Sequence, residues 1–142
     1  DYKCGQIFEL EEGVVVRTGK LNHPNGACGY RIEFAGKAIA ICTDTEHFED
    51  DIDQNVVSLS QDADVMVYDS AYTQENYPKF KGWGHSTWQE AVKVAETANV
   101  KQTFLFHHDP SHDDTKMDAI AKEVAKIRSG VRPAVEGEEI EI

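Results

Sequence analysis

The sequence predicts an α/β domain, and three observations lead to that prediction. The first half of the chain carries β-branched and alternating apolar runs, which are typical of strands. The second half reads strand, helix, strand, helix, an order that favours helices packed outside a sheet. The chain has 142 residues, of which 40% are hydrophobic, so it can bury a substantial core. This composition excludes wholesale disorder, a collagen helix and a coiled coil.

The first half contains three strand patterns. Residues 14–18 are mostly valine and follow a turn-forming Gly13. Residues 28–34 alternate between apolar and polar side chains, and residues 37–43 form the next strand. The Ala-Gly pair between these two strands predicts a tight β-hairpin.

The middle of the chain is predicted to alternate between loops and short elements. Residues 44–53 are acidic and polar, which indicates a loop or the loose start of a helix. Residues 54–61 predict a short helix, and the apolar run at 64–68 predicts a buried strand. Residues 69–85 contain a proline and two glycines and predict a long loop, a kind of segment that often carries function.

Two overlapping capping patterns mark the start of the next helix. Ser86 with Gln89 forms one capping box, and Thr87 with Glu90 forms a competing one. The apolar residues that follow recur at helical spacing, so one face of this helix is predicted to pack on the sheet.

The last part of the chain predicts a strand, a helix and a tail. Residues 100–106 are apolar and form the strand. Residues 114–128 carry an apolar stripe at helical spacing, and Gly130 is a plausible stop for that helix. Residues 134–142 form an acidic tail that either adds a final strand or frays. No internal repeat or linker is present, so residues 1–142 are predicted to form a single domain or half of one.

Charge and hydropathy exclude several classes of function. The 26 acidic residues outnumber the 14 basic ones and give a formal net charge of −12. Such a chain has little to attract a phosphate backbone, so nucleic acid is a disfavoured partner. No run of about 18 apolar residues exists, which argues against a membrane span, and no signal peptide is recognised.

The cysteines predict a reduced protein in the cytoplasm. Cys4, Cys28 and Cys42 are odd in number and widely spaced, and no CxxC pair exists that could bind zinc. We therefore expect Cys28 and Cys42 to be buried on strands as free thiols.

Four residues with metal-binding side chains fall at predicted strand ends or in loops. These are His23, Asp44, His85 and His107. Strand ends can converge on one edge of a sheet, where histidine nitrogens with a carboxylate suit metals of the zinc class. Any one of these histidines, taken alone, is more often a surface or hydrogen-bonded residue than a ligand. For these four residues together, spacing alone does not distinguish between one metal site and four separately solvated side chains.

Four short motifs around these residues resemble, in order and spacing, the ribonuclease Z-like branch of the metallo-β-lactamase fold. The resemblance runs over residues 13–128. The motifs are Leu21-Asn22-His23-Pro24 followed by Gly29–Glu33, Thr43-Asp44-Thr45, Gly84-His85-Ser86-Thr87, and Leu105-Phe106-His107 with Pro110.

The resemblance implies a role for each motif residue. His23 would ligate one metal ion, His107 would ligate another, and Asp44 would bridge the two. His85 would be the catalytic histidine near the scissile phosphate, and Asp69 would orient His85 or a neighbouring group. The implied cofactors are two divalent ions in the complete fold, zinc first, with manganese or iron as alternatives.

Three other histidines remain candidates beside this set. A shift of the alignment by one position would make His108 the ligand in place of His107. His47 and His112 are candidates for residues that support the ligands from behind.

One departure from the family is large, because the HxHxDH motif, which supplies most of its metal ligands, is absent from this sequence. The chain, which begins at Asp1 rather than Met, therefore resembles only the C-terminal half of an αββα sandwich, a mixed sheet with helices on its outer face. Such a half leaves an apolar sheet face in need of a partner. We expect that partner to be the missing N-terminal half or a second copy of the chain.

The function implied by the resemblance is metal-dependent hydrolysis of a phosphodiester by water activated between two metals, with this chain supplying part of the site. The charge favours a small phosphoester over a long RNA. The main alternative is a metal-poor module that binds a partner or itself without catalysis. A plain globular domain with scattered histidines is the third, and four motifs in order disfavour it.

Overall fold

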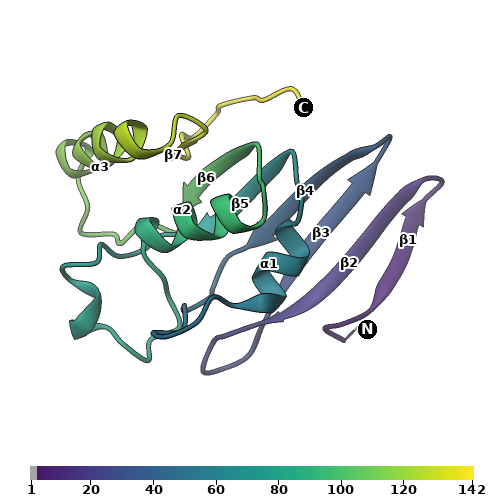
Figure 1. Cartoon of the computed structure of the whole chain (residues 1–142), viewed down its shortest axis with the longest axis horizontal. Coiled ribbons are helices and arrows are strands. Elements are labelled where there is room, and N and C mark those ends of the chain that lie inside the picture. Colours follow the sequence, from purple (N-terminus) through teal and green to yellow (C-terminus); the bar gives the residue numbers. More distant parts are fainter. Residues whose placement is uncertain (1–2) are drawn as a thin grey trace.

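The computed structural model describes residues 3–142, which form one seven-stranded sheet with three α-helices (Figure 1). The order of strands in the sheet is the order in the chain. The strands are β1 (Ile7–Glu11), β2 (Val14–Leu21), β3 (Ala27–Phe34), β4 (Lys37–Cys42), β5 (Val65–Asp69), β6 (Gln102–Phe106) and β7 (Val131–Pro133). The predicted α/β class is confirmed.

The sheet changes its pairing at β4. Strands β1 to β4 pair antiparallel through short connections, whereas β4 to β7 pair parallel. Parallel neighbours need a crossover, and each crossover here contains one helix. The helices are α1 (Gln54–Ser60), α2 (Trp88–Thr97) and α3 (Asp114–Ile127), and a 3₁₀ turn, η1 (Tyr77–Lys79), lies in the predicted long loop.

Each α-helix begins at a side-chain cap. Asp53, Thr87 and Asp113 precede α1, α2 and α3, and each accepts a hydrogen bond from a backbone N–H of the first turn. These bonds satisfy N–H groups that have no partner within the helix. Of the two overlapping capping boxes, the one that starts at Thr87 is therefore used, and Ser86 is left for another role.

The main core lies between the helices and one face of the sheet. Helices α1 and α2 lie in front of the strands in Figure 1, and α3 lies beyond β6 beside β7. At Gly29 of β3 an added Cβ would lie 2.8 Å from Leu59 of α1, so the helix packs directly on the strand backbone. Buried core residues include Ala40, Met66, Tyr68, Ala91, Ala95, Leu105 and Val124.

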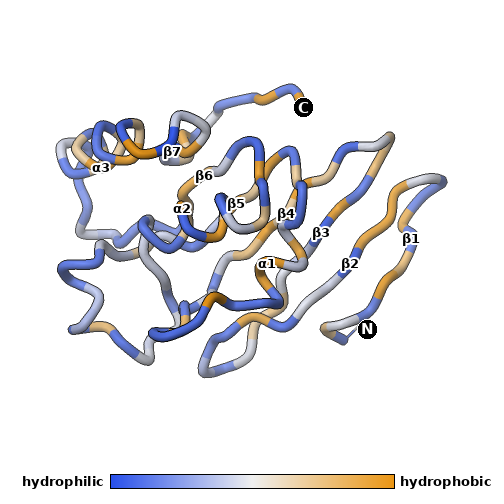
Figure 2. Tube along the Cα trace, viewed as in Figure 1, coloured by the Kyte–Doolittle hydropathy of each residue, from blue (hydrophilic) through white to orange (hydrophobic). Residues whose placement is uncertain are grey.

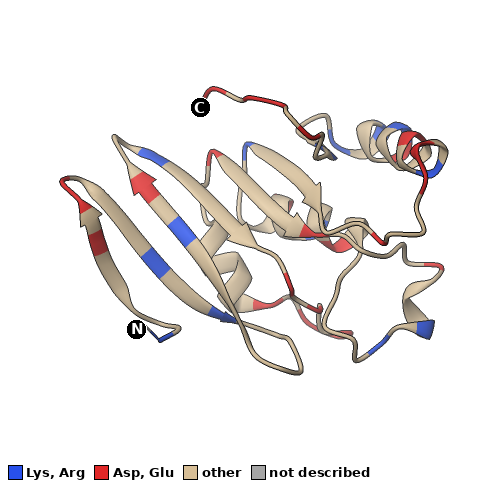
Figure 3. Ribbon diagram, turned by 180° about the vertical axis from the view of Figure 1, so that it is seen from behind, with Lys and Arg blue, Asp and Glu red and all other residues tan. Residues whose placement is uncertain are grey.

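The opposite face of the sheet carries no helix, as the view from behind shows (Figure 3). Ile39 and Ile41 alternate along β4 with fully or nearly buried alanines, so they point away from the helices. Val67 and Phe106 lie on the same face through the registered pairs of β4, β5 and β6, and Phe106 is 47% exposed. Figure 2 shows the apolar colour along these central strands. The αββα half predicted from the sequence requires such an uncovered face.

Part of this face is covered by the C-terminal tail. Val135 and Ile140 of the tail, together with Val67 and Phe104 of the sheet, line a cavity of about 330 Å³. The tail forms no strand within the described residues, so the final strand allowed for at 134–142 is absent there. Instead β7 forms just before it, next to Gly130.

Two strands were missed and one was predicted too short. Strand β1 has the sequence IFELE, a short alternating run that the sequence reading overlooked. It is mostly exposed and, among the described strands, pairs only with β2. Strand β7 has only three residues, which is below what periodicity can detect. Strand β2 runs on to Leu21, through a glycine and a lysine that weaken its β pattern.

The cysteine prediction is corrected in part. Cys4 and Cys28 form a disulfide with their Cα atoms 5.7 Å apart, so Cys28 is not a free thiol. This bond joins the segment before β1 to the start of β3. Cys42 is free and buried as predicted, and its burial raises the pKa of the thiol to about 12.

Charged residues are distributed unevenly. In Figure 3 basic residues lie along β2 and β3, many acidic residues lie in loops and in the tail, and α3 carries both signs. Among the described residues, none of the helices has the length and apolar character needed to cross a membrane.

Asp64 provides a first test of the fold, because it joins three strands at the end of the sheet where β5 begins. Its carboxylate accepts hydrogen bonds from Lys101 at 2.7 Å and from the backbone N–H of Ala38 at 2.9 Å. These bonds, that of Lys101 first, lower the pKa of the Asp64 carboxyl to about 2. The unfolded value is about 3.9. The carboxylate therefore stabilises the fold above about pH 4, and its contribution is lost as the pH falls from about 4 to about 2.

We expect Asp64→Asn to lower the free energy of unfolding at pH 7 by on the order of 1–2 kcal/mol. Urea unfolding at a series of pH values measures this. Between pH 4 and 2 the variant should lose less stability than the native chain does. Glu123→Gln, at an exposed position of α3, is the control. Parallel pH profiles for Asp64→Asn and the native chain would contradict the assignment.

The disulfide provides a second test. A cross-link that closes a loop of 24 residues is expected to stabilise a protein by about 2–4 kcal/mol. Replacing both Cys4 and Cys28 by serine should lower the unfolding free energy by that amount. Dithiothreitol should destabilise the native chain to the same level and leave the double variant unchanged. If the reductant has no effect on the native chain, the bond does not stabilise the fold.

Candidate metal centre

The candidate site residues meet at one edge of the sheet. Asp69 is the last residue of β5, His107 directly follows β6, and Asp44 lies two residues after β4. These three strands are parallel, so their carboxyl ends lie at the same edge. Strand β2 runs in the same direction as β4, which brings His23 in the following loop to that edge as well. The long loop adds His85.

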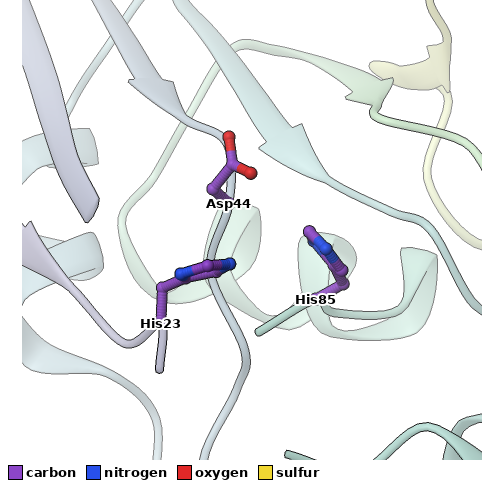
Figure 4. Close-up of side chains that lie close together, drawn as sticks. All are labelled: His23, Asp44 and His85. Atoms are coloured by element: carbon purple, nitrogen blue, oxygen red, sulfur yellow. The ribbon is translucent and has the colours of Figure 1, made fainter. Parts of the chain in front are cut away.

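Within the described residues, these side chains form two groups that could hold a metal ion. One group is His23, Asp44 and His85, and the other is Asp69, His85 and His107. In each group the ligand atoms lie within 4.8 Å of one another. Figure 4 shows Asp44 and the rings of His23 and His85 around a common space. The two groups share His85, and His107 Nδ1 lies 3.9 Å from an oxygen of Asp44.

Asp69 is the fully buried centre of the hydrogen bonding in this site. The Nδ1 atoms of His85 and His107 lie 2.9 Å and 3.2 Å from one oxygen of its carboxylate. That oxygen also accepts a bond from the backbone N–H of Thr45, and the other accepts one from Ser86. Because a carboxylate accepts the Nδ1 proton of each ring, Nε2 remains the nitrogen available to a substrate or a metal.

His107 is affected most directly by Asp69. The hydrogen bond from Asp69 raises the pKa of His107 above its usual value, although burial of the ring opposes this. His107 and Asp44 also adopt left-handed backbone conformations, with φ of 60° and 58°. Non-glycine residues rarely do so, and such strain is concentrated at functional sites.

The loop of His85 packs tightly on the loop of His23. Gly84 has a φ of +92°, and a Cβ added to it would lie 2.2 Å from Cδ2 of His23. A side chain at position 84 would collide with the ring of His23, so only glycine fits there. The ring centroids of His23 and His85 are 5.7 Å apart.

Glu46 is a member of the site that the sequence reasoning missed. Its carboxylate is buried and accepts bonds from the hydroxyl of Tyr77 and from the N–H groups of Gly82 and Gly84. Burial by itself would raise the pKa of Glu46, but these hydrogen bonds outweigh it and lower the pKa. The dense polar run from Thr43 to His47, directly after an apolar strand, was the available signal.

His47, which the sequence suggested as a residue behind the ligands, contacts the residue next to His85. Its Nδ1 lies 2.9 Å from Oγ of the fully buried Ser86, which also contacts the hydroxyl of Tyr68 at 3.3 Å. Burial lowers the pKa of His47. Ser86 follows His85 directly, so this chain of polar groups fixes the backbone beside the candidate catalytic histidine.

The two remaining candidates lie outside both groups. His108 lines a cavity together with residues of α3 and the start of the tail, and burial lowers its pKa. His112 has no hydrogen bond for its Nδ1 within the described structure. Of the adjacent pair His107 and His108, it is His107 that faces Asp69 and Asp44.

Comparison with known families identifies the superfamily of the chain. Residues 5–108 match the family described as the beta-lactamase superfamily domain. The chain belongs to that superfamily. The family resemblance predicted from the four motifs is thereby confirmed.

The chain is also similar to curated ribonuclease Z sequences. It is 26% identical over 134 residues to that of Bacillus cereus strain G9842, covering 94% of this chain and 39% of the relative. It is 27% identical over 140 residues to that of Oenococcus oeni, covering 99% and 38%. The chain thus spans about two-fifths of the length of these relatives.

Solved structures show the same fold. The metallo-beta-lactamase fold protein YhfI from Bacillus subtilis superposes with a TM-score of 0.79 at 18% identity, over 96% of this chain and 53% of that one. The short form of human tRNase Z gives 0.69 at 21% identity, over 96% and 46%. Each solved chain is about twice as long as the part that matches, and the shared fold confirms the predicted architecture.

A glycine pair in the long loop tests the packing around His23. Gly82 and Gly84 both have positive φ, so alanine at either position should cost about 1–2 kcal/mol. Only at Gly84 would the new Cβ meet His23, because nothing lies within 4 Å of the position at Gly82. We expect Gly84→Ala to shift the imidazole signals of His23 in proton–carbon NMR spectra, and Gly82→Ala to leave them in place. Equal shifts in both variants would contradict this packing.

Proposed function

We propose that this chain supplies the C-terminal part of a metal-dependent hydrolase that cleaves a phosphodiester. The observation that supports the proposal most is the convergence of His23, Asp44, His85 and His107 around the buried Asp69. Their order and spacing follow the motifs of the superfamily, and curated relatives bear the name ribonuclease Z.

The donor set fits divalent metals of the zinc class. We assign His23 to one ion, His107 to a second, and Asp44 to both, because Asp44 faces each histidine. Imidazole nitrogen and carboxylate oxygen are the ligands that zinc, manganese and iron accept in proteins. Two such ions would polarise the phosphate oxygens and lower the pKa of a water between them.

His85 and Asp69 are assigned to catalysis rather than to metal binding. The bond from His85 Nδ1 to Asp69 holds the ring in one orientation and leaves Nε2 facing outward. As water adds to phosphorus and the bond to the leaving oxygen breaks, Nε2 can give a proton to that oxygen. The pair therefore performs general acid catalysis with a fixed donor.

The chain provides only part of the ligands. His23, Asp44 and His107 are three protein ligands for two ions, whereas about four ligands per zinc are usual. The HxHxDH motif is absent from the sequence. The uncovered apolar face of the sheet offers a place for the part that carries the other ligands. We propose that this partner is the N-terminal half of the fold, with a second copy of this chain as the alternative.

The charge of the chain supports a small phosphoester as substrate. A formal net charge of −12 repels the backbone of a long RNA, although relatives carry the name ribonuclease Z. The acidic loops around the site would be offset locally by the metal ions.

The second candidate function is a non-catalytic module that binds a partner or itself. The exposed apolar face favours it, because such a face associates whether or not metals are present.

The cytoplasmic location predicted from cysteine spacing stays a prediction. The Cys4–Cys28 disulfide weighs against that location, since disulfides are rare in cytosolic proteins.

The test is the zinc content of the purified chain after loading and desalting, by plasma mass spectrometry. We expect His23→Ala and His107→Ala each to lower the retained zinc, and His112→Ala, the matched control outside both groups, to leave it unchanged. Equal zinc in all four proteins would refute the assignment. About two zinc ions per native chain would refute only the proposal that this chain supplies part of the site, and the ligand assignment would stand.

Catalysis is tested in the complete protein with bis(p-nitrophenyl) phosphate as the probe. We expect His85→Ala to lower the turnover number by about 10²–10⁴-fold, which is the usual contribution of general acid–base catalysis. The zinc content should stay at the native level. Loss of zinc together with activity would instead make His85 a metal ligand.

A further inference from the structure

Glu46 has an unusual set of partners for a buried acidic residue. Its side chain is 7% exposed, and it lies two residues after Asp44. None of the ion pairs found in the described part of the chain includes it. A buried carboxylate without a cation is costly unless its oxygens are well hydrogen-bonded. Its hydrogen bonds are therefore what keeps it in place.

Those bonds bind the loop that leads to His85. One oxygen accepts the hydroxyl of Tyr77 and the N–H of Gly82, both at 2.7 Å. The other accepts the N–H of Gly84 at 2.9 Å. Both glycines have positive φ, which turns the loop so that it follows the carboxylate. The loop is thus attached to Glu46 at its 3₁₀ turn and again directly beside His85.

The backbone of Glu46 binds the loop that carries His23. Its N–H donates to the carbonyl of Asn22 at 2.8 Å, and the side-chain amide of Asn22 donates to its carbonyl at 2.9 Å. Asn22 directly precedes His23. The two bonds therefore hold this loop against the segment that follows β4.

Glu46 consequently connects all three members of one candidate group. Asp44 lies on the same segment, His23 is next to Asn22, and His85 is next to Gly84. These residues come from loops that are far apart in the sequence, and Gly84 already presses on the ring of His23. Moving the Gly84 backbone would therefore change the separation of the two rings.

We propose that Glu46 is a positioning residue that sets the placement of His85 relative to His23 and Asp44. It acts through the glycine N–H groups and Asn22 and does not touch the reacting atoms. The expected effect on metal affinity rests on the proposed function, whereas the placement of the two rings is measurable without any metal.

The experiment compares three variants of the full chain with the native protein. Glu46→Gln keeps the shape but replaces one acceptor oxygen by an NH₂ group, so at least one of the loop contacts is lost. Tyr77→Phe removes a single donor and leaves both glycine contacts. Asp64→Asn is the matched control, because it removes a buried carboxylate charge at the other end of the sheet.

The first readout uses the metal-free proteins. Amide hydrogen exchange of Gly82 and Gly84 and the imidazole NMR signals of His23 and His85 report the loop and the rings. In Glu46→Gln we expect exchange at Gly84 to be at least about tenfold faster than global unfolding explains, with shifts of both imidazoles. Asp64→Asn should change neither beyond its effect on global stability. Native-like exchange and imidazole signals in Glu46→Gln would overturn the proposal.

The second readout uses Co²⁺ alone as the probe, followed by its visible absorption. Residues that support metal ligands from behind usually contribute about 10–100-fold to affinity. We expect a loss in that range for Glu46→Gln, less than about fivefold for Tyr77→Phe, and none for Asp64→Asn. If Co²⁺ binds to Glu46→Gln as it does to the native chain, Glu46 does not position the ligands. If the native chain binds no Co²⁺, the chain alone does not form a metal site, and the metal-free readout decides the role of Glu46.

Discussion

The site depends on one buried carboxylate, that of Asp69. Its oxygens accept hydrogen bonds from Nδ1 of His85 and His107 and from the backbone N–H groups of Thr45 and Ser86. These bonds fix the segments that carry these four residues to the end of β5. A buried carboxylate requires such donors, and the donors in turn lose their freedom to move. The same bonds that stabilise the charge therefore fix the tautomer and direction of both rings. The same hydrogen bonds therefore determine both the stability of the sheet edge and the orientation of the site residues.

A second buried carboxylate, that of Glu46, has a different role from that of Asp69. Asp69 orients the rings of His85 and His107 directly, whereas Glu46 bonds to the backbone and to Tyr77 and so determines where the loops run. Neither relies on a lysine or arginine. An arginine at this edge would compete with a metal ion for the carboxylates, so neutral donors suit a site that binds cations. The acidic balance of the chain is thus compatible with its local chemistry.

The fold could be read from the sequence where the periodicity was strong. The hairpin of β3 and β4, the buried β5 and β6, and the three helices were all predicted, because alternation, short apolar runs and caps are local signals. Strands β1 and β7 depend on pairing with neighbours, which the local pattern does not contain. Among site residues, the motifs pointed to His23, Asp44, His85 and His107, and Asp69 was expected before the long loop. The structure brings these side chains to one edge of the sheet, and their roles stay predictions. For Glu46 the polar run after β4 indicated only its neighbourhood, because its contacts with Asn22, Gly82 and Gly84 come together only in three dimensions.

The order of the strands has a consequence for how this chain reaches its structure. Every strand pairs with a neighbour in the chain, but the parallel pairs β4–β5, β5–β6 and β6–β7 each wait for a whole crossover to form. Long-range pairing of this kind is slow, whereas β1 to β4 close through short turns and are expected to form first. The helices close their core on one face without help from the other face. Under the proposed function, the helix-covered face is therefore complete before a second sheet is added, and the step that creates the active centre would be an association of folded sheets and not a folding reaction.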